Sequence, residues 1–365
     1  MRLSSFINRG LLLAFSGLAI SPVLSAQEVT FHKDIEPILQ RSCQTCHRDG
    51  GVAPMPLVSY EETAPFAGLI EYKTSLRDRA GAMPPFYAEK NIGIQHIKDD
   101  PSLSDAELAA ISTWARSGAP KGDAADAPAP LVFDNNAKWK LGEPDKIVQL
   151  KDFLMEGGRP DWWGELPSVS TGMTEDRYVK SVEIIEVNDV NEGVAASDTV
   201  GGLYIFHHMI WRTEVVDENG KIVPGQSVSF PVHEVGRNGD VFDPEAGPLL
   251  AANSAFFTDS VHMHSNGRDT VGHLEIGFRF HPKGYEPKYK SAISILGNGV
   301  DISVEGDAKD QELHAYQVLT QNTKVITFEP HLHAPGERMC LEAIWGYSVE
   351  TISCVGYDHN WVRGY

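Results

Sequence analysis

The pattern of hydrophobic and polar positions changes near residue 131, and the stretch before that point is helical in character. Lys33 to Gln40 has the pattern of a helical turn, and Glu61 to Arg79 has a helix-forming composition. Ser104 to Glu107 forms a capping box, which predicts a helix that ends at Gly118. The sequence therefore predicts a small all-α unit in the N-terminal part of the chain.

After Leu131 the apolar residues come in short runs of Val, Ile, Thr, Tyr and Phe, separated by Gly, Pro, Asn and Asp. Such runs are typical of the strands of antiparallel β-sandwiches. We expect strands at Val179 to Val187, Tyr204 to Val215, Leu274 to Phe280 and Lys324 to Phe328. The expected fold is therefore multidomain, with a small all-α domain followed by an all-β sandwich region.

A short segment between the two regions has the composition of a tether. Asp123 to Pro130 is acidic, rich in proline and built of small residues, so it cannot form a core. We therefore expect a helical domain at residues 27–122, a linker at 123–133 and the β region from residue 134 onward.

The run Cys43-Gln44-Thr45-Cys46-His47 carries the most specific chemistry. Two thiols three positions apart can add to the two vinyl groups of one haem, and the next residue supplies an imidazole to the iron. A redox dithiol would follow a hydrophobic strand, which is missing here, and a zinc site would need a second ligand pair, whereas the next cysteine is Cys340. The motif predicts covalently bound haem c.

Met83 is the candidate for the second axial ligand of that haem. It lies between the predicted helices in Gly81-Ala82-Met83-Pro84-Pro85-Phe86, where two prolines stiffen the loop. A thioether held in this way suits a haem that transfers electrons. The alternative is a methionine that only fills the core.

The N-terminus has the pattern of an export signal at residues 1–26. Arg2 and Arg9 form a basic start, Leu11 to Ile20 is apolar but too short to span a bilayer, and small residues precede Gln27. The alternative is a membrane anchor, but no stop-transfer pattern follows. Because haem c is attached outside the cytoplasm, we expect a soluble periplasmic protein with no membrane span after signal cleavage.

Composition and charge narrow the possible partners. The chain has 365 residues, of which 42% are hydrophobic, so it can form about two or three packed domains. Its net charge of −19 argues against nucleic acid and anionic membranes, which bind cationic surfaces.

Cys340 and Cys354 lie in two β-prone runs that can fold as a hairpin centred near Tyr347. A disulfide between them suits an oxidising compartment, and two buried free thiols are the alternative.

Histidine is concentrated in the β region, where 11 of the 14 histidines lie beyond residue 200. Three clusters stand out: His207-His208-Met209, His262-Met263-His264 and His331-Leu332-His333. In a strand, residues i and i+2 share a face, so each His-x-His pair can bind one ion. Adjacent histidines can do so only at a bulge, at a strand end or through different ring nitrogens. Imidazole-rich sites suit copper, zinc or iron. The remaining histidines in the β region are expected at the surface or as groups that orient ligands: His233, His273, His281, His314 and His359.

The order of motifs in the N-terminal part resembles a bacterial c-type cytochrome domain. The similarity consists of Cys43 to His47, Met83 to Pro85, Leu103 to Glu107 and Trp114 to Asp123. Such a domain is often fused ahead of a copper monooxygenase module. The resemblance covers roughly a quarter of the chain and implies that Cys43, Cys46, His47 and Met83 bind the haem.

The β region resembles the type II, ascorbate-dependent copper monooxygenases, a family that includes peptidylglycine hydroxylating monooxygenase. The resemblance lies in Tyr178 to Lys180 upstream of His-His-Met, His262 to Arg268 and Pro330 to Gly336. That family has two successive jelly-roll-like β-sandwiches with one copper on each, facing across a solvent-filled cleft. The resemblance implies sandwiches at 134–292 and 293–365, of which the second is incomplete.

The resemblance also implies the copper ligands. The electron-supplying copper would be held by His207, His208 and His262, with His264 as the competing third ligand. The oxygen-activating copper would be held by His331 and His333 plus a methionine well downstream, for which the chain ending at Tyr365 offers no match. Met339 lies in a presumed strand and is expected in the core. We interpret the chain as a fragment that lacks the methionine ligand of the second copper.

Together these features predict a periplasmic haem- and copper-dependent monooxygenase. Electrons from a periplasmic donor would pass through the haem to the first copper, and the second copper, at His331 and His333, would use O2 to hydroxylate an aliphatic C–H bond of a small-molecule substrate. One alternative is a non-catalytic electron-transfer cytochrome with a vestigial copper module. Another is a zinc-binding adhesion or carbohydrate module beside a cytochrome. Four aromatic residues can line a pocket or fill the core: Trp162, Trp163, Phe256 and Phe257.

Overall fold

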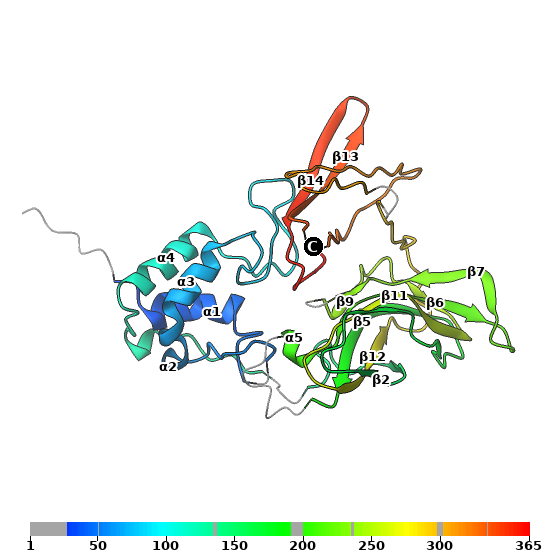
Figure 1. Cartoon of the computed structure of the whole chain (residues 1–365), viewed down its shortest axis with the longest axis horizontal. Coiled ribbons are helices and arrows are strands. Elements are labelled where there is room, and N and C mark those ends of the chain that lie inside the picture. Colours follow the sequence, from blue (N-terminus) through cyan, green and yellow to red (C-terminus); the bar gives the residue numbers. More distant parts are fainter. Residues whose placement is uncertain are drawn as a thin grey trace, which may run out of the picture.

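The structure is a computed structural model that describes residues 28–49, 51–133, 137–190, 200–234, 237–297, 302–333 and 335–365. The predicted signal peptide lies outside these residues. A helical part stands on one side, two large sheets stand on the other, and the C-terminus lies between them (Figure 1). Across the described ranges, the helices are too short or too polar to cross a membrane.

The N-terminal part is made of short helices around a small core. Its elements are η1 (Phe31–Ile35), α1 (Glu36–Ser42), α2 (Tyr60–Thr63), η2 (Ala64–Phe66), α3 (Ala67–Ser75), α4 (Asp105–Arg116) and η3 (Ala124–Asp126). The capping box predicted at Ser104 and Glu107 is present and begins α4. The stretch predicted from Glu61 to Arg79 is helical but divided, with Pro65 in the 3-10 turn between α2 and α3. Phe31, Leu39, Ile70, Ile111 and Trp114 fill the core.

Two six-stranded antiparallel sheets form the larger part of the protein. The first contains β1 (Lys146–Gln149), β2 (Phe153–Met155), β5 (Arg177–Asn188), β9 (Gly239–Val241), β10 (Leu249–Leu250) and β12 (Thr270–Phe280). The second contains β3 (Trp162–Gly164), β4 (Val169–Ser170), β6 (Phe206–Val216), β7 (Ile222–Ser229), β8 (His233–Glu234) and β11 (Ser254–Met263), with α5 (Val200–Leu203) just before β6.

The two sheets share one hydrophobic core. Ile276 and Phe278 on β12 are fully buried from the first sheet, and Trp211 and Phe256 enter the same core from the second. Because strand residues alternate between faces, each sheet keeps a second face outside this core. The predicted antiparallel sheets around a common core are confirmed for the three strands expected between residues 179 and 280.

The C-terminal part contains one hairpin, β13 (Arg338–Trp345) paired with β14 (Ser348–Gly356). Cys340 lies opposite Cys354 and the two form a disulfide, so this prediction is confirmed. The strand predicted at Lys324 to Phe328 is wrong. These residues have no neighbouring strand and are largely exposed, apart from Phe328, whose backbone exchanges two hydrogen bonds with Tyr365.

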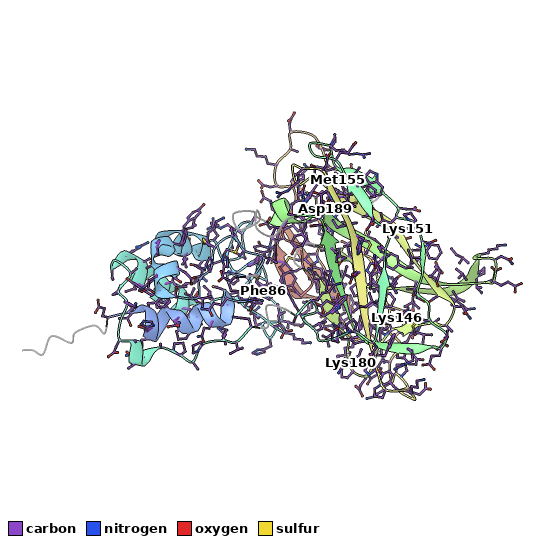
Figure 2. All side chains as sticks on the ribbon, turned by 90° about the horizontal axis from the view of Figure 1, so that it is seen from below. Phe86, Lys146, Lys151, Met155, Lys180 and Asp189 are labelled. Carbon is purple, nitrogen blue, oxygen red and sulfur yellow. A yellow bond between two sulfur atoms is a disulfide. The ribbon has the colours of Figure 1, made fainter. Side chains whose placement is uncertain are left out.

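The hairpin and the chain end contact the helical part directly. Ala88 forms a β-bridge with Val355, and Arg338 makes a salt bridge with Glu89. Tyr87 and Val355 are buried in a small cluster shared by the two parts. Figure 2 shows Phe86, from the same loop, at the junction between the helices and the β region. The C-terminal segment therefore bridges the two halves of the protein.

A buried carboxyl group fixes the start of β6. Glu186 on β5 accepts hydrogen bonds from the backbone N–H groups of Ile205 and Phe206, each at 3.0 Å. Burial raises the pKa of Glu186 to about 7. The unfolded chain ionises near the ordinary value of 4.5, so the stability that this group contributes is complete below that pH. It is lost as the pH rises through 7.

We expect Glu186→Gln, which cannot ionise, to remove this loss. Relative to the parent, its free energy of unfolding should rise by about 3 kcal/mol between pH 4.5 and pH 8. Urea unfolding of the metal-free proteins at several pH values measures the difference. The exposed Glu143→Gln is the matched control and should follow the parent. Parallel pH profiles for parent and Glu186→Gln would contradict this account.

Candidate metal centre and Cys-x-x-Cys-His site

Four residues lie side by side across four strands of the second sheet. Trp163 on β3 pairs with His262 on β11, His262 pairs with His208 on β6, and His208 pairs with Glu234 on β8. Residues paired across antiparallel strands project from the same face. The next residue after His208, Met209, points into the core, so this four-residue row projects from the outer face of the sheet.

His207 joins the row through a β-bulge. His262 pairs with His208 and Met263 pairs with Phe206, so the register passes over His207. In a regular strand His207 and His208 would point to opposite faces, but the irregularity brings their Nδ1 atoms to 3.1 Å. Of the arrangements that would let adjacent histidines share one ion, the structure has the bulge.

The three histidines form a buried group with converging nitrogens. His207, His208 and His262 are 3%, 4% and 2% exposed, and one nitrogen from each lies within 4.8 Å of the others. Burial, with smaller contributions from neighbouring histidines, lowers the pKa of His207 to about 3 and that of His208 to about 2. Both imidazoles are therefore neutral at neutral pH, which is the form that binds metal ions.

Two hydrogen bonds decide which nitrogens carry protons. His207 Nε2 lies 3.1 Å from the carbonyl oxygen of His359, which can only accept, so the lone pair of His207 is on Nδ1, the atom that faces His208 Nδ1. His262 Nε2 lies 2.9 Å from the carboxylate of Asp161, and its buried Nδ1 has no hydrogen-bond partner among the described residues. A buried nitrogen with a free lone pair beside two others fits a metal ion.

His264 belongs to a second, more open group. It lies one residue beyond β11, and its ring nitrogen is grouped within 4.8 Å with His262 and the carboxylate of Asp161. Asp161 is exposed, and His264 is half-buried. Of the two candidates for the third ligand, the structure places His262 with both His207 and His208, whereas His264 shares its group with Asp161.

His331 and His333 lie against the same cluster. The His331 ring is 5.1 Å from that of His208 and 5.6 Å from that of His333, which in turn is 6.3 Å from Trp163. Their prediction as a strand pair is wrong, since residues 331–333 have no regular secondary structure. The chain here crosses the outer face of the sheet instead of pairing with it. All three histidine clusters are thus brought together in one region.

Glu234 links the sheet to His331. This carboxylate is fully buried, and its Oε1 accepts a hydrogen bond from His331 Nδ1 at 2.9 Å, which leaves the lone pair of His331 on Nε2. Its Oε2 has no hydrogen-bond partner within the described ranges. The nearby Arg237 is engaged by Asp240 and Glu329. A fully buried carboxyl group with one oxygen unbonded, beside several imidazoles, favours binding of a cation.

The Cys43 to His47 segment lies at the end of α1. Cys43 and Cys46 are free thiols, and burial raises the pKa of Cys43 to about 12, whereas reactive dithiols need a lowered pKa. His47 Nδ1 donates a hydrogen bond to the carbonyl of Met55 at 2.9 Å, so its lone pair is on Nε2. Two free thiols beside an oriented neutral imidazole fit attachment of haem.

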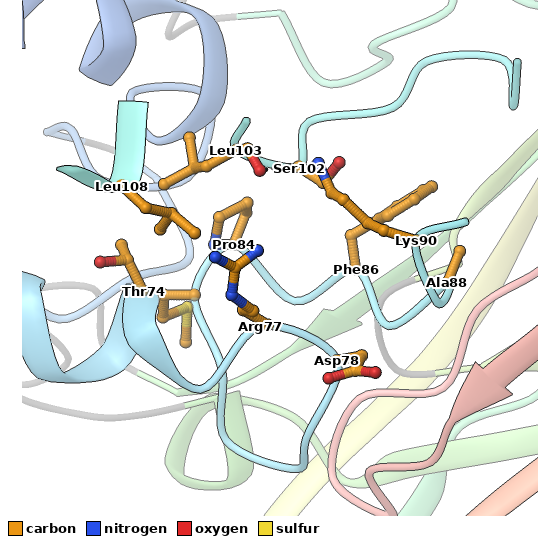
Figure 3. A pocket seen from close by; sticks show the side chains of 11 residues that line it. Thr74, Arg77, Asp78, Pro84, Phe86, Ala88, Lys90, Ser102, Leu103 and Leu108 are labelled. Carbon is orange, nitrogen blue, oxygen red and sulfur yellow. Dashed lines mark hydrogen bonds between the residues drawn. The ribbon is translucent and has the colours of Figure 1, made fainter. Parts of the chain in front are cut away.

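Met83 lies in a loop between α3 and α4. Its side chain is 40% exposed, so it is not a core methionine. It lines a cavity of about 230 Å³ together with Thr74, Leu103 and Leu108 (Figure 3). The thioether is therefore accessible to a ligand.

The other predicted residues separate into core and site. Phe256 is in the core between the sheets, whereas Trp163 stacks on His262 with ring centroids 3.8 Å apart. Asp161 and Glu234, which contact the histidines, were not assigned to a site from the sequence, whereas His359 was expected at the surface or as a group that orients a ligand. The one signal for Glu234 is a carboxylate directly after a histidine in a short apolar run.

No family model matches the chain, and no curated protein matches it either.

The two groupings around His262 and His264 make different predictions for metal binding. We expect His262→Ala to weaken Cu(I) binding at least about 100-fold, because loss of an orienting partner alone costs about 10- to 100-fold. His264→Ala should have a smaller effect, and the exposed His314→Ala should have none. Competition with a chromogenic Cu(I) chelator measures the affinities. A larger loss for His264→Ala than for His262→Ala would identify Asp161, His262 and His264 as the ligand set.

Glu234→Gln separates metal binding from stability. The substitution replaces a fully buried carboxyl group by an amide of similar shape that cannot ionise, so the metal-free protein should become more stable to urea. The same change should weaken metal binding about 10- to 100-fold, because His331 loses its charged partner. Unfolding curves with and without metal measure both effects. If Glu234→Gln lowers the stability of the metal-free protein as well as its affinity for metal, Glu234 does not balance the charge of a cation.

Proposed function

We propose that this protein is an exported haem- and copper-dependent monooxygenase, in which haem c supplies electrons to a histidine-bound copper centre that hydroxylates an aliphatic C–H bond. The observation that carries the proposal is the group of three buried histidines with converging nitrogens on the outer face of the second sheet. The free thiols and oriented imidazole at Cys43 to His47 support the haem. The Cys340–Cys354 disulfide is consistent with an oxidising compartment such as the periplasm.

In this proposal the side chains of the sheet hold and orient the copper centre. His207, His208 and His262 would bind the first ion, and His331 and His333 would bind the second. Asp161 and Glu234 hold protons away from the ligand nitrogens of His262 and His331. Bound copper would supply one-electron chemistry with O2. Trp163 covers one face of His262 and is half exposed, which provides an apolar surface for a small organic substrate.

In the helical part, Cys43 and Cys46 would attach the haem covalently, and His47 would be one axial ligand through Nε2. Met83, accessible on its loop, would be the other. A soluble periplasmic donor would supply the electrons.

A non-catalytic electron-transfer protein is the second candidate. The observation that favours it is the contact between His331 and His208, whose rings are 5.1 Å apart. This closeness makes the second histidine pair part of the first cluster, whereas the resemblance implies two coppers on opposite sides of a cleft.

The decisive experiment measures cofactors and product on the same sample. We expect one covalently attached haem and copper in the protein exported from a host with haem-attachment machinery. Reduced enzyme should then consume O2 and form a hydroxylated product from one of a panel of small C–H substrates. His208→Ala should keep the haem and lose both copper and product, because it removes a ligand at the centre of the row. O2 consumption with no product in the copper-loaded parent would support the electron-transfer protein instead.

A further inference from the structure

The loop that carries Met83 is held against the C-terminal segment by one carboxylate. Asp358 Oδ2 accepts hydrogen bonds from the backbone N–H of Gly81 at 2.8 Å and from the hydroxyl of Tyr87 at 3.1 Å. These donors flank Met83 on either side. The loop is also tied to α3, since Met83 N–H donates to the carbonyl of Lys73.

The residue after Asp358 touches the histidine cluster. The carbonyl oxygen of His359 accepts a hydrogen bond from Nε2 of His207 at 3.1 Å, and the two rings are 5.1 Å apart. Asp358 and His359 are consecutive, so the same short piece of backbone contacts the Met83 loop on one side and His207 on the other. Gly81 is therefore joined to His207 by one hydrogen bond to the Asp358 side chain, the covalent bonds from there to the His359 carbonyl, and one hydrogen bond from His207 to that carbonyl.

The hydrogen bond from the Tyr87 hydroxyl to Asp358 lies in a buried environment. Tyr87 is 2% exposed, and burial together with the charge of Asp358 raises the pKa of its hydroxyl, which keeps it a donor. The backbone N–H of Tyr87 also donates to the hydroxyl of Tyr365 at 3.1 Å. The Asp358 carboxylate thus accepts a hydrogen bond from a residue that is itself buried and bonded at the interface.

We propose that Asp358 and His359 form the electron-transfer route from the haem domain to the histidine cluster. The proposal rests on the proposed function for its two redox groups. A ferrous haem held by Cys43, Cys46 and His47 would give one electron to a Cu(II) ion held at His207, so iron would be oxidised by one unit and copper reduced by one. The intervening residues exchange no atoms or protons.

The test compares variants of the full-length, haem- and copper-loaded protein. Oxygen-free Cu(II) protein is mixed with a fast one-electron reductant of the haem, and reoxidation of the haem is followed by its absorbance. We expect Asp358→Ala to slow reoxidation severalfold, because it removes both hydrogen bonds that join the Met83 loop to the backbone of His359. Tyr87→Phe, which removes only one of the two hydrogen bonds, should slow it less. Copper content and the haem spectrum should stay unchanged in both variants.

Arg338→Gln is the matched control, because it removes the salt bridge to Glu89 from the same interface without touching the route. It should leave the reoxidation rate unchanged. Equal slowing in Asp358→Ala and Arg338→Gln would show that docking of the two parts controls the rate, and would overturn the route. An unchanged rate in both Asp358→Ala and Tyr87→Phe would also overturn it. A parent protein that lacks haem or copper would overturn the proposed function, and the route with it.

Discussion

The register between β6 and β11 is the constraint on which the candidate metal centre depends. It sets His262 directly beside His208, and the irregularity at the next position brings His207 round to the same face. Since strand residues alternate between faces, a slip of one residue would turn His262 into the core and Met263 outward. The hydrophobic core fixes this register, because Val261, Met263 and Met209 must all remain buried. Packing of the core therefore decides the geometry of the site on the opposite face.

The candidate metal centre also requires the C-terminal segment that covers the outer face of the second sheet. Residues on an exposed sheet face are normally solvated, yet His207, His208 and His262 are almost completely buried. His331 and His359 come from the C-terminal segment and lie on them. This cover removes water from the imidazoles, which is the main reason that the pKa values of His207 and His208 are low. The sheet supplies the donor atoms, and the crossing segment supplies the dry environment.

The elements that sequence reasoning could predict are those set by local pattern. The capping box at Ser104, the alternation in β5 and β12, and the hairpin between Cys340 and Cys354 each have their cause within a few residues of chain. The need for a bulge at His207 also follows from strand geometry alone. These features were predicted because neighbouring residues determine them.

The remaining features depend on contacts between distant segments. The partner of Glu234 is His331, and His207 is held by the carbonyl of His359, so no local pattern marks either interaction. Every residue has a backbone carbonyl, so the residue type does not indicate which carbonyl accepts the hydrogen bond from His207. The strand expected at Lys324 to Phe328 failed for the same reason, because a β-prone run forms a strand only where another strand lies beside it.

The sharing of the histidines between sheet and crossing segment has a consequence for how the protein matures. His207 and His359 are 152 residues apart, and closing so long a loop comes late in folding. An ion bound by groups from both segments would stabilise only the closed arrangement, so metal uptake and closure are thermodynamically linked. The ion would then bind tightly only to chains whose C-terminal segment already lies against the sheet, and it would bind weakly to partly folded chains.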